Sequence, residues 1–110
     1  MQFLVLIRGN EGSVLPPAQE VALVRESYEQ LAAGKDKRIT AVYPFVGERA
    51  CALLCEASTA DELQESLMSL PFNRLVRTEC HVIGAARSMA DGLRRVEQQL
   101  TNLSPASARN

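Results

Sequence analysis

The hydrophobic pattern near the start of the chain predicts a strand followed by a helix. Residues 2–8 are β-prone and almost uniformly apolar, which is typical of a central strand with both faces covered. After a turn and a pair of prolines, apolar residues recur at the spacing of one helix face. These positions are Val21, Val24, Tyr28 and Leu31. The helix should run over 17–33 and stop at Gly34.

The middle of the chain has the pattern of two paired strands. From Ile39 the residues are β-prone up to a turn at Gly47-Glu48, and an apolar run continues over 49–57. The short turn between the two runs predicts an antiparallel hairpin. Pro44 lacks the amide hydrogen that a strand ladder needs, so it should lie at a sheet edge, at a bulge or near the end of its strand.

A second helix and a last strand are predicted beyond the hairpin. Thr59 followed by Glu62 matches a capping box, so a helix should begin there, and Pro71 should end it. The buried stripe of the helix should consist of Leu63, Leu67 and Leu70. Residues 75–83 then alternate in two sets, as a strand does. One set is Arg77, Glu79 and His81, and the other is Val76, Thr78, Cys80 and Val82.

The order βαββαβ predicts an α+β fold of the ferredoxin-like type over residues 1–84. In this fold both helices cover one face of a four-stranded antiparallel sheet. The other face is left apolar, and a patch of that size favours the packing of two sheets face to face. The sequence therefore predicts a homodimer.

Residues 85–103 are expected to form an additional amphipathic helix, with Ser88 and Asp91 at its cap. Its apolar residues recur at alternating steps of four and three, at Met89, Leu93, Val96, Leu100 and Leu103. Two heptads are too short for a stable isolated coiled coil, so the stripe should pack on the body or on a partner subunit. Residues 104–110 are predicted to be a disordered tail.

Composition and charge narrow the class of protein. A chain of 110 residues with 46% hydrophobic and 23% charged residues fits one ordinary globular domain. Its formal net charge of -1 provides no basic field for nucleic acid or for an anionic membrane. The longest apolar run, residues 3–7, is far shorter than a membrane span. Three cysteines without a disulfide spacing fit a cytoplasmic protein, and all three are expected to be buried thiols.

Several segments together carry a family resemblance. They are the opening strand, Gly34-Lys35, Gly47, Asp61-Glu62-Leu63 and, as the most specific, Ser69-Leu70-Pro71-Phe72. Over residues 1–83 the chain resembles the muconolactone Δ-isomerase-like family. The resemblance implies a dimeric α/β barrel, often assembled into larger rings, with a ligand cleft between sheet and helices near a subunit contact. It also implies isomerase chemistry, the shift of a double bond in muconolactone within aromatic catabolism.

The chain departs from the enzymes of this family in three places. Asn73-Arg74-Leu75 follows Phe72, where the enzymes continue with a second proline and an aromatic residue. No His-Pro pair follows the last strand, and the chain has no tryptophan for the Trp-Arg pair of their second strand. These departures keep an alternative function open, which is a non-catalytic oligomeric binding protein with the same fold.

Moving a double bond beside a lactone carbonyl needs a base, a proton donor and a cation that holds the substrate carboxylate. His81 is the single histidine and the candidate base, with Glu79 to orient it. Arg77 lies on the same face, about 6–7 Å from Glu79 along the strand, and would anchor the carboxylate. The alternative interpretation is that these three residues form a solvated or dimer-facing polar surface.

Further candidates lie on the other predicted elements. Tyr28 and Tyr43 would donate a proton to an enolate or bind the substrate, although each also fits an ordinary core aromatic. Arg8 ends the first strand, where it would bind an anionic group or simply cap the strand in solvent. Arg49 beside Glu48 is expected to form an exposed ion pair.

Other chemistries have little support in the residues. Cys51 and Cys55 would lie about 13 Å apart on one strand, too far for a shared metal or a disulfide. With a single histidine as well, no metal is expected. No Gly-rich phosphate-binding motif opens a helix, so no nucleotide cofactor is expected either. RNA binding on the sheet would need exposed aromatics that the strands lack. A cofactor-free monooxygenase would rest on fold analogy alone.

Overall fold

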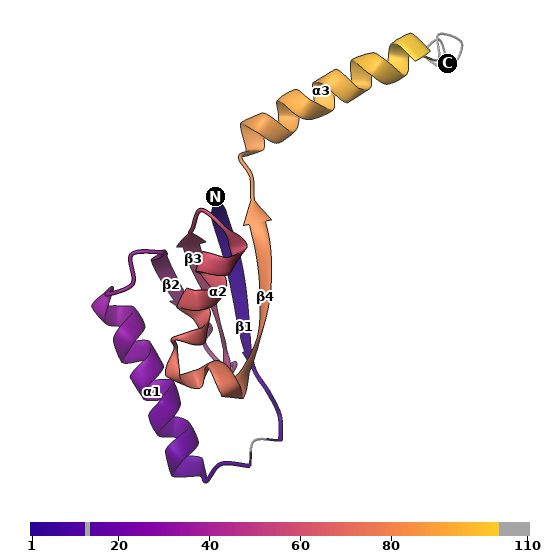
Figure 1. Cartoon of the computed structure of the whole chain (residues 1–110). Coiled ribbons are helices and arrows are strands. Elements are labelled where there is room, and N and C mark those ends of the chain that lie inside the picture. The colour runs from indigo at the N-terminus through magenta and orange to yellow at the C-terminus, as the bar shows by residue number, and fades with distance from the viewer. Residues whose placement is uncertain (13, 104–110) are drawn as a thin grey trace.

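The computed structural model describes residues 1–12 and 14–103 and has the order β-α-β-β-α-β followed by a third helix (Figure 1). The elements are β1 (Gln2–Gly9), α1 (Pro17–Ala33), β2 (Ile39–Pro44), β3 (Ala50–Glu56), α2 (Ala60–Met68), the 3-10 helix η1 (Pro71–Leu75), β4 (Val76–Ile83) and α3 (Ala86–Leu103). The four strands form one antiparallel sheet in the order β2-β3-β1-β4, and α1 and α2 lie on the same face of it (Figure 1). The predicted ferredoxin-like α+β fold is confirmed. The predicted tail over 104–110 lies outside the described residues.

The central position of β1 follows from its apolar sequence. It pairs with β3 on one side and with β4 on the other, so both of its edges are hydrogen-bonded. Phe3, Val5 and Ile7 point toward the helices and are buried. Leu4 and Leu6 point to the opposite face, which is called the open face below, and they remain partly exposed. The prediction of a strand covered on both faces therefore holds for the helix side alone.

The turn between β2 and β3 is longer than the apolar pattern predicts. β2 ends at Pro44, which has no amide hydrogen to continue the ladder. The Phe45 amide then donates to the Ala50 carbonyl at 3.0 Å and closes the turn, in which Gly47 has a φ of 84°. Phe45 and Val46 therefore belong to the turn and not to the strand. Pro44 lies on an edge strand at its last residue, as predicted.

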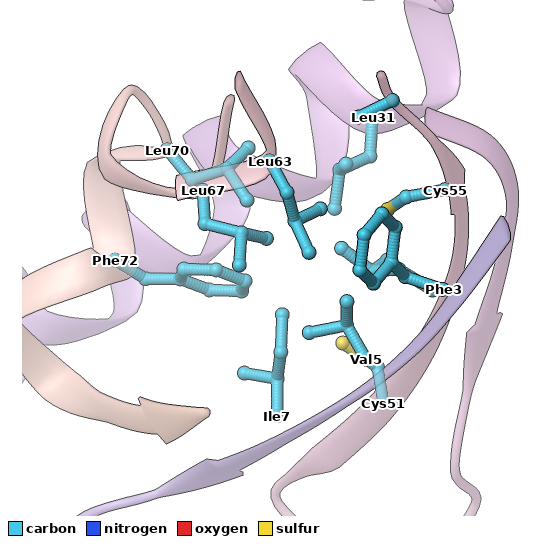
Figure 2. Close-up of a cluster of buried hydrophobic side chains, with 12 residues drawn as sticks. Phe3, Val5, Ile7, Leu31, Cys51, Cys55, Leu63, Leu67, Leu70 and Phe72 are labelled. Carbon is cyan, nitrogen blue, oxygen red and sulfur yellow. The ribbon is translucent and has the colours of Figure 1, made fainter. Parts of the chain in front are cut away.

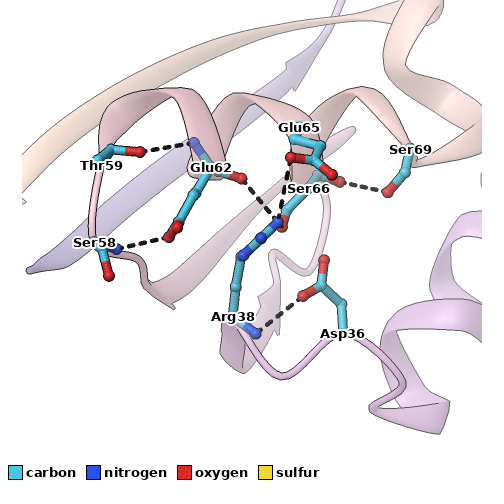
Figure 3. Close-up of polar contacts among 8 residues, drawn as sticks. All are labelled: Asp36, Arg38, Ser58, Thr59, Glu62, Glu65, Ser66 and Ser69. Carbon is cyan, nitrogen blue, oxygen red and sulfur yellow. Dashed lines mark hydrogen bonds and ion pairs between the residues drawn. The ribbon is translucent and has the colours of Figure 1, made fainter.

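The N-terminus of α2 forms the predicted cap (Figure 3). The Thr59 hydroxyl accepts a hydrogen bond from the Glu62 amide at 3.2 Å, and the Glu62 carboxylate accepts one from the Ser58 amide at 2.9 Å. Arg38, which precedes β2, holds the same helix from the side (Figure 3). Its guanidinium donates to the Glu62 carbonyl at 3.2 Å and to the Ser66 hydroxyl at 3.3 Å. This pairing satisfies the buried hydroxyl of Ser66.

The core lies between the sheet and the two helices (Figure 2). It contains the predicted leucines Leu31, Leu63, Leu67 and Leu70 together with Phe72 and the inward residues of β1 and β3. Val21 is an exception, because it lies near the start of α1 and is exposed rather than buried. The two buried residues of α1 are Leu31 and Ser27, and the Ser27 hydroxyl is hydrogen-bonded.

Three other predictions need correction. Cys80 is exposed, unlike Cys51 and Cys55, because neither α1 nor α2 covers the helix-facing side of β4. Leu75 belongs to η1, a helix that the sequence analysis did not predict, so β4 begins one residue later. α3 begins at Ala86, which makes Ser88 an interior residue of the helix and not its cap.

α3 projects away from the rest of the molecule (Figure 1). None of its 18 residues is buried. The radius of gyration is 20.2 Å, whereas a compact domain of this length would have about 13 Å. Within the described ranges, no helix has both the length and the apolar character needed to cross a membrane.

Candidate functional site

A mostly apolar cleft opens at the end of the sheet where β1 and β2 finish and β3 and β4 begin. Its volume is about 570 Å³, which lies within the usual range for small-molecule sites. Ile7, Ala50, Cys51 and Val76 form the sheet side, Val24 and Tyr28 come from α1, and Phe72 and Leu75 come from η1. The β2–β3 turn closes one side with Phe45, Glu48 and Arg49. The cleft is thus an apolar space with few polar groups.

Tyr28 is positioned by contacts on two sides. Its ring meets the Phe72 ring edge-to-face, with centroids 6.1 Å apart at an angle of 88°. Phe72 is held in turn by its amide, which donates to the Ser27 hydroxyl at 2.9 Å. The Tyr28 hydroxyl is hydrogen-bonded to the thiol of Cys51 on β3. The phenol is therefore fixed between α1, η1 and the sheet.

The electrostatics keep both polar side chains in the interior of the cleft neutral. Burial, assisted by the hydrogen bond to Cys51, raises the pKa of Tyr28 to about 12. Burial also raises the pKa of the Cys51 thiol, an effect that the Tyr28 hydrogen bond partly opposes. At neutral pH the cleft therefore offers a phenol and a thiol as hydrogen-bond donors, and neither carries charge.

The charged groups gather around the rim of the cleft. Arg49 forms an ion pair with Glu20, which lies in the first turn of α1, and Glu48 pairs with Arg8 at 3.3 Å. The expected Arg49–Glu48 pair is therefore wrong, since each residue of the turn finds a partner elsewhere. The Glu20 side chain is only 16% exposed, whereas that of Arg49 is 71% exposed. Arg49 is thus accessible to an anion in solution.

The six predicted site residues lie on two different faces of the sheet. Tyr28 lines the cleft. The register places the other five on the open face, because their strand partners alternate with the inward residues of β1 and β3. These five are Arg8, Tyr43, Arg77, Glu79 and His81. Tyr43 belongs to one edge strand and the last three to the other, at opposite sides of the four-stranded sheet.

The structure does bring His81 and Glu79 together. The His81 Nε2 and a Glu79 carboxylate oxygen are 3.4 Å apart. Both side chains are more than half exposed on β4. Arg77 lies directly across from Arg8 on the neighbouring strand. The roles assigned to these residues stay predictions, and they belong to the open face rather than to the cleft.

Three residues of the cleft were not singled out as ligand-binding residues by sequence reasoning. Arg49 was interpreted as a surface ion pair, Cys51 as an inert thiol, and Phe72 as part of a family segment. The apolar pattern of β3 indicated that Cys51 is buried, but no local signal indicates that the Tyr28 hydroxyl contacts it. The Arg49–Glu20 pair joins residues far apart in the sequence, so spacing alone does not reveal it.

Comparison with solved structures finds several of the same architecture, and two of them are compared with this chain. One is muconolactone isomerase, with a TM-score of 0.64 and 18% identity, covering 77% of this chain and 90% of that chain. The fold is that of muconolactone isomerase. The other is 5-chloro-2-hydroxyhydroquinone dehydrochlorinase from Burkholderia phenoliruptrix AC1100 in complex with 2,5-dihydroxybenzoquinone, with a TM-score of 0.55 and 21% identity, covering 80% of this chain and 98% of that chain. No protein-family model matches the chain, and no curated protein sequence matches it.

The predicted resemblance to the muconolactone Δ-isomerase-like family is confirmed at the level of the fold. Both neighbours share the muconolactone isomerase fold and are named for reactions on small ring compounds. In this chain, the cleft described above lies between the sheet and the helices, as the resemblance implied.

Proposed function

We propose that the protein binds a small unsaturated organic acid or lactone in the cleft and shifts a double bond in it by cofactor-independent proton transfer. The observation that carries this proposal is the fixed, neutral phenol of Tyr28 inside an apolar cleft whose rim carries the accessible Arg49. The ring of the ligand would lie against Ile7, Val24 and Phe72, and its carboxylate would reach the rim.

Arg49 is the anchor for the carboxylate. A ligand anion would replace the Glu20 carboxylate on the guanidinium, in a charge-assisted hydrogen bond of the same type. Glu20 lies in the first turn of α1, where the helix dipole stabilises a negative charge after the exchange. The affinity for the ligand therefore depends on how well its carboxylate competes with the Glu20 carboxylate for the Arg49 guanidinium.

Proton transfer needs a base that takes a proton from the ligand and an acid that returns one to it. A base removes a proton from a carbon acidified by the lactone carbonyl, the electron pair moves into an enolate, and a proton returns at the other end of the conjugated system. Tyr28 would donate a hydrogen bond to the enolate oxygen, since its raised pKa keeps it protonated at neutral pH. Glu48 is the carboxylate that lines the cleft and would act as the base, after it exchanges its solvent-exposed ion pair with Arg8 for the ligand proton.

The predicted pair of His81 and Glu79 gives a different location for the base. If two sheets pack through their open faces, this pair and Arg77 face a second subunit, and a site would form between the two copies.

A non-catalytic binding protein is the second candidate function. The position of the single histidine outside the cleft favours it, because the commonest general base is then absent from the cleft residues.

The test uses muconolactone with the purified protein in heavy water, followed by proton NMR. Isomerised product or deuterium incorporation above the buffer control supports proton transfer. Tyr28→Phe should lower turnover at least tenfold, and Arg49→Gln should weaken binding at least tenfold. His81→Ala should leave both unchanged, because it lies on the open face.

Other outcomes discriminate among the candidates. Loss of turnover in His81→Ala alone would move the site to the open face. Saturable binding of muconolactone or 2,5-dihydroxybenzoquinone without any turnover would support the binding protein. Absence of binding of either compound to the cleft would overturn the proposal.

A further inference from the structure

The cleft gathers aromatic side chains from three separate elements. Of the three phenylalanines and two tyrosines in the sequence, Tyr28 from α1, Phe45 from the β2–β3 turn and Phe72 from η1 line it. Phe45 is partly buried although it belongs to a turn, whereas Val46 beside it is fully exposed. The Phe45 ring is therefore directed at the cleft rather than at solvent. Such a lining favours a ligand that presents a flat apolar surface.

The cleft is larger than a single small ring requires. Its volume of about 570 Å³ equals that of roughly 19 water molecules at about 30 Å³ each. An acid with one small ring would fill about half of that space and leave the remainder to water. Water held between apolar walls is poorly ordered, and its displacement by an apolar group increases affinity. The dimensions therefore favour a ligand with a larger apolar body.

The anion anchor and the phenol lie at the two ends of a row on α1. Glu20, Val24 and Tyr28 follow one another at four-residue steps, so they lie on the same side of this helix. At about 1.5 Å per residue, Glu20 and Tyr28 are about 12 Å apart along the helix axis. The Arg49 guanidinium is paired with Glu20, and Val24 lines the cleft in the middle of the row. Two rings in line cover that distance more completely than one ring does.

Charge is confined to one end of the cleft. Among the described residues that line it, the charged ones are Glu48 and Arg49, which are neighbours in the β2–β3 turn. Glu48 is paired with Arg8, whereas the Arg49 guanidinium is accessible to an anion. Tyr28 and Cys51 in the interior are neutral. A second charge on the ligand would therefore be buried without a partner, which carries a large free-energy cost.

We infer that the ligand of the cleft is a monocarboxylic acid with an apolar body of two rings, one of which can be an unsaturated lactone. The inference rests on the proposed function and specifies the substrate class of the same site. The carboxylate would bind Arg49 at the mouth, and the two rings would extend along Val24 toward Phe72. A carbonyl oxygen at the far end of the body would accept the hydrogen bond of Tyr28.

Isothermal titration calorimetry of the full-length protein with three probes tests this ligand class. 2-Naphthoate has one carboxylate and two fused rings, benzoate lacks the second ring, and naphthalene-2,6-dicarboxylate adds a second charge at the opposite end. 2-Naphthoate should bind at least tenfold more tightly than benzoate, because its second ring displaces water from the apolar walls. The dicarboxylate should bind at least tenfold more weakly than 2-naphthoate, because its second charge would be buried without a partner.

Val24→Phe fills the middle of the row and has a matched control on the same helix. It should weaken the binding of 2-naphthoate at least tenfold and leave that of benzoate within about twofold. Val21→Phe makes the same change at a residue that is 67% exposed and outside the cleft, so it should alter neither affinity. Arg49→Gln should weaken both acids at least tenfold, since both bind through the carboxylate. The comparison of probes on the unsubstituted protein does not depend on the folding of any variant.

The other outcomes separate this inference from the proposed function. Equal affinities for benzoate and 2-naphthoate, both lowered in Arg49→Gln, would overturn the two-ring class and leave the cleft as the site of the reaction. Binding of 2-naphthoate that neither Val24→Phe nor Arg49→Gln weakens would place this acid outside the cleft and overturn the inference. A preference for 2-naphthoate without turnover of muconolactone would support the ligand class and count against the proposed reaction. No binding of any of these acids would overturn both.

Discussion

The Ser27 hydroxyl accepts a hydrogen bond from the Phe72 amide at 2.9 Å and donates one to the Leu23 carbonyl at 2.8 Å. Ser27 is fully buried, so this hydroxyl is the link that joins α1 to η1 inside the core. Because the Phe72 ring also contacts Tyr28, the same link shapes the wall of the cleft.

Ser27→Ala should lower the free energy of unfolding by about 1–3 kcal/mol, since it leaves the buried Phe72 amide without an acceptor. Urea denaturation followed by circular dichroism measures this loss. Ser69→Ala is the matched control, because the Ser69 hydroxyl donates to the Ser66 carbonyl within its own turn and supports no distant amide. Equal effects of the two substitutions would contradict the role assigned to Ser27.

Alkaline pH should weaken the fold through Tyr28. Its pKa is raised to about 12 in the folded protein, mainly by burial, whereas an unfolded tyrosine ionises near pH 10. The folded chain thus holds the phenol proton more tightly, and this stabilisation is complete below about pH 10 and lost as the pH rises through about 12. Urea titrations across this window should show a smaller decline in Tyr28→Phe, which has no such proton. An identical decline would argue against a buried phenol.

The cap of α2 should contribute a measurable share of the stability. Thr59→Ala removes the oxygen that accepts the Glu62 amide and should lower the free energy of unfolding by about 1 kcal/mol. Ser58→Ala keeps the Ser58 backbone amide that binds the Glu62 carboxylate, so it should change stability much less. Thermal denaturation of both variants tests the difference, and a larger effect of Ser58→Ala would refute this cap.

Cys51 and Cys55 should be unreactive in the native protein. Both are buried, and burial raises the pKa of both thiols, that of Cys55 to about 11. Since the thiolate is the nucleophile, alkylation by iodoacetamide near neutral pH should follow unfolding. Mass spectrometry of peptides labelled at increasing urea concentrations measures this. Rapid native labelling of Cys55 would indicate that β3 opens locally.

Local patterns predicted the elements better than they predicted the site. The period of Leu63 and Leu67, together with the cap at Thr59, fixes α2 and its buried side. Val21 fits the same kind of period, yet it is exposed because α1 extends past the sheet at that end. A helical period indicates which residues share a side, and it does not indicate how far the partner layer extends.

The alternation in β4 shows the same limit for the candidate site. It correctly groups His81 with Glu79, which lie 3.4 Å apart. It does not reveal which side of the strand meets the helices, and the pairing of His81 with Leu4 places this group on the open face. Tyr28 was identified through its helical spacing, whereas its partner Cys51 and the Arg49–Glu20 pair depend on contacts between distant segments.

Only Gly84 and Ala85 separate the end of β4 from the start of α3. The backbone dihedrals of these two residues therefore set the direction in which the 18-residue helix leaves the sheet. A small rotation at this connection moves the far end of the helix by a large distance, because α3 is about 27 Å long at 1.5 Å per residue. The direction of the longest helix of the molecule thus depends on the shortest connection between a strand and an α-helix.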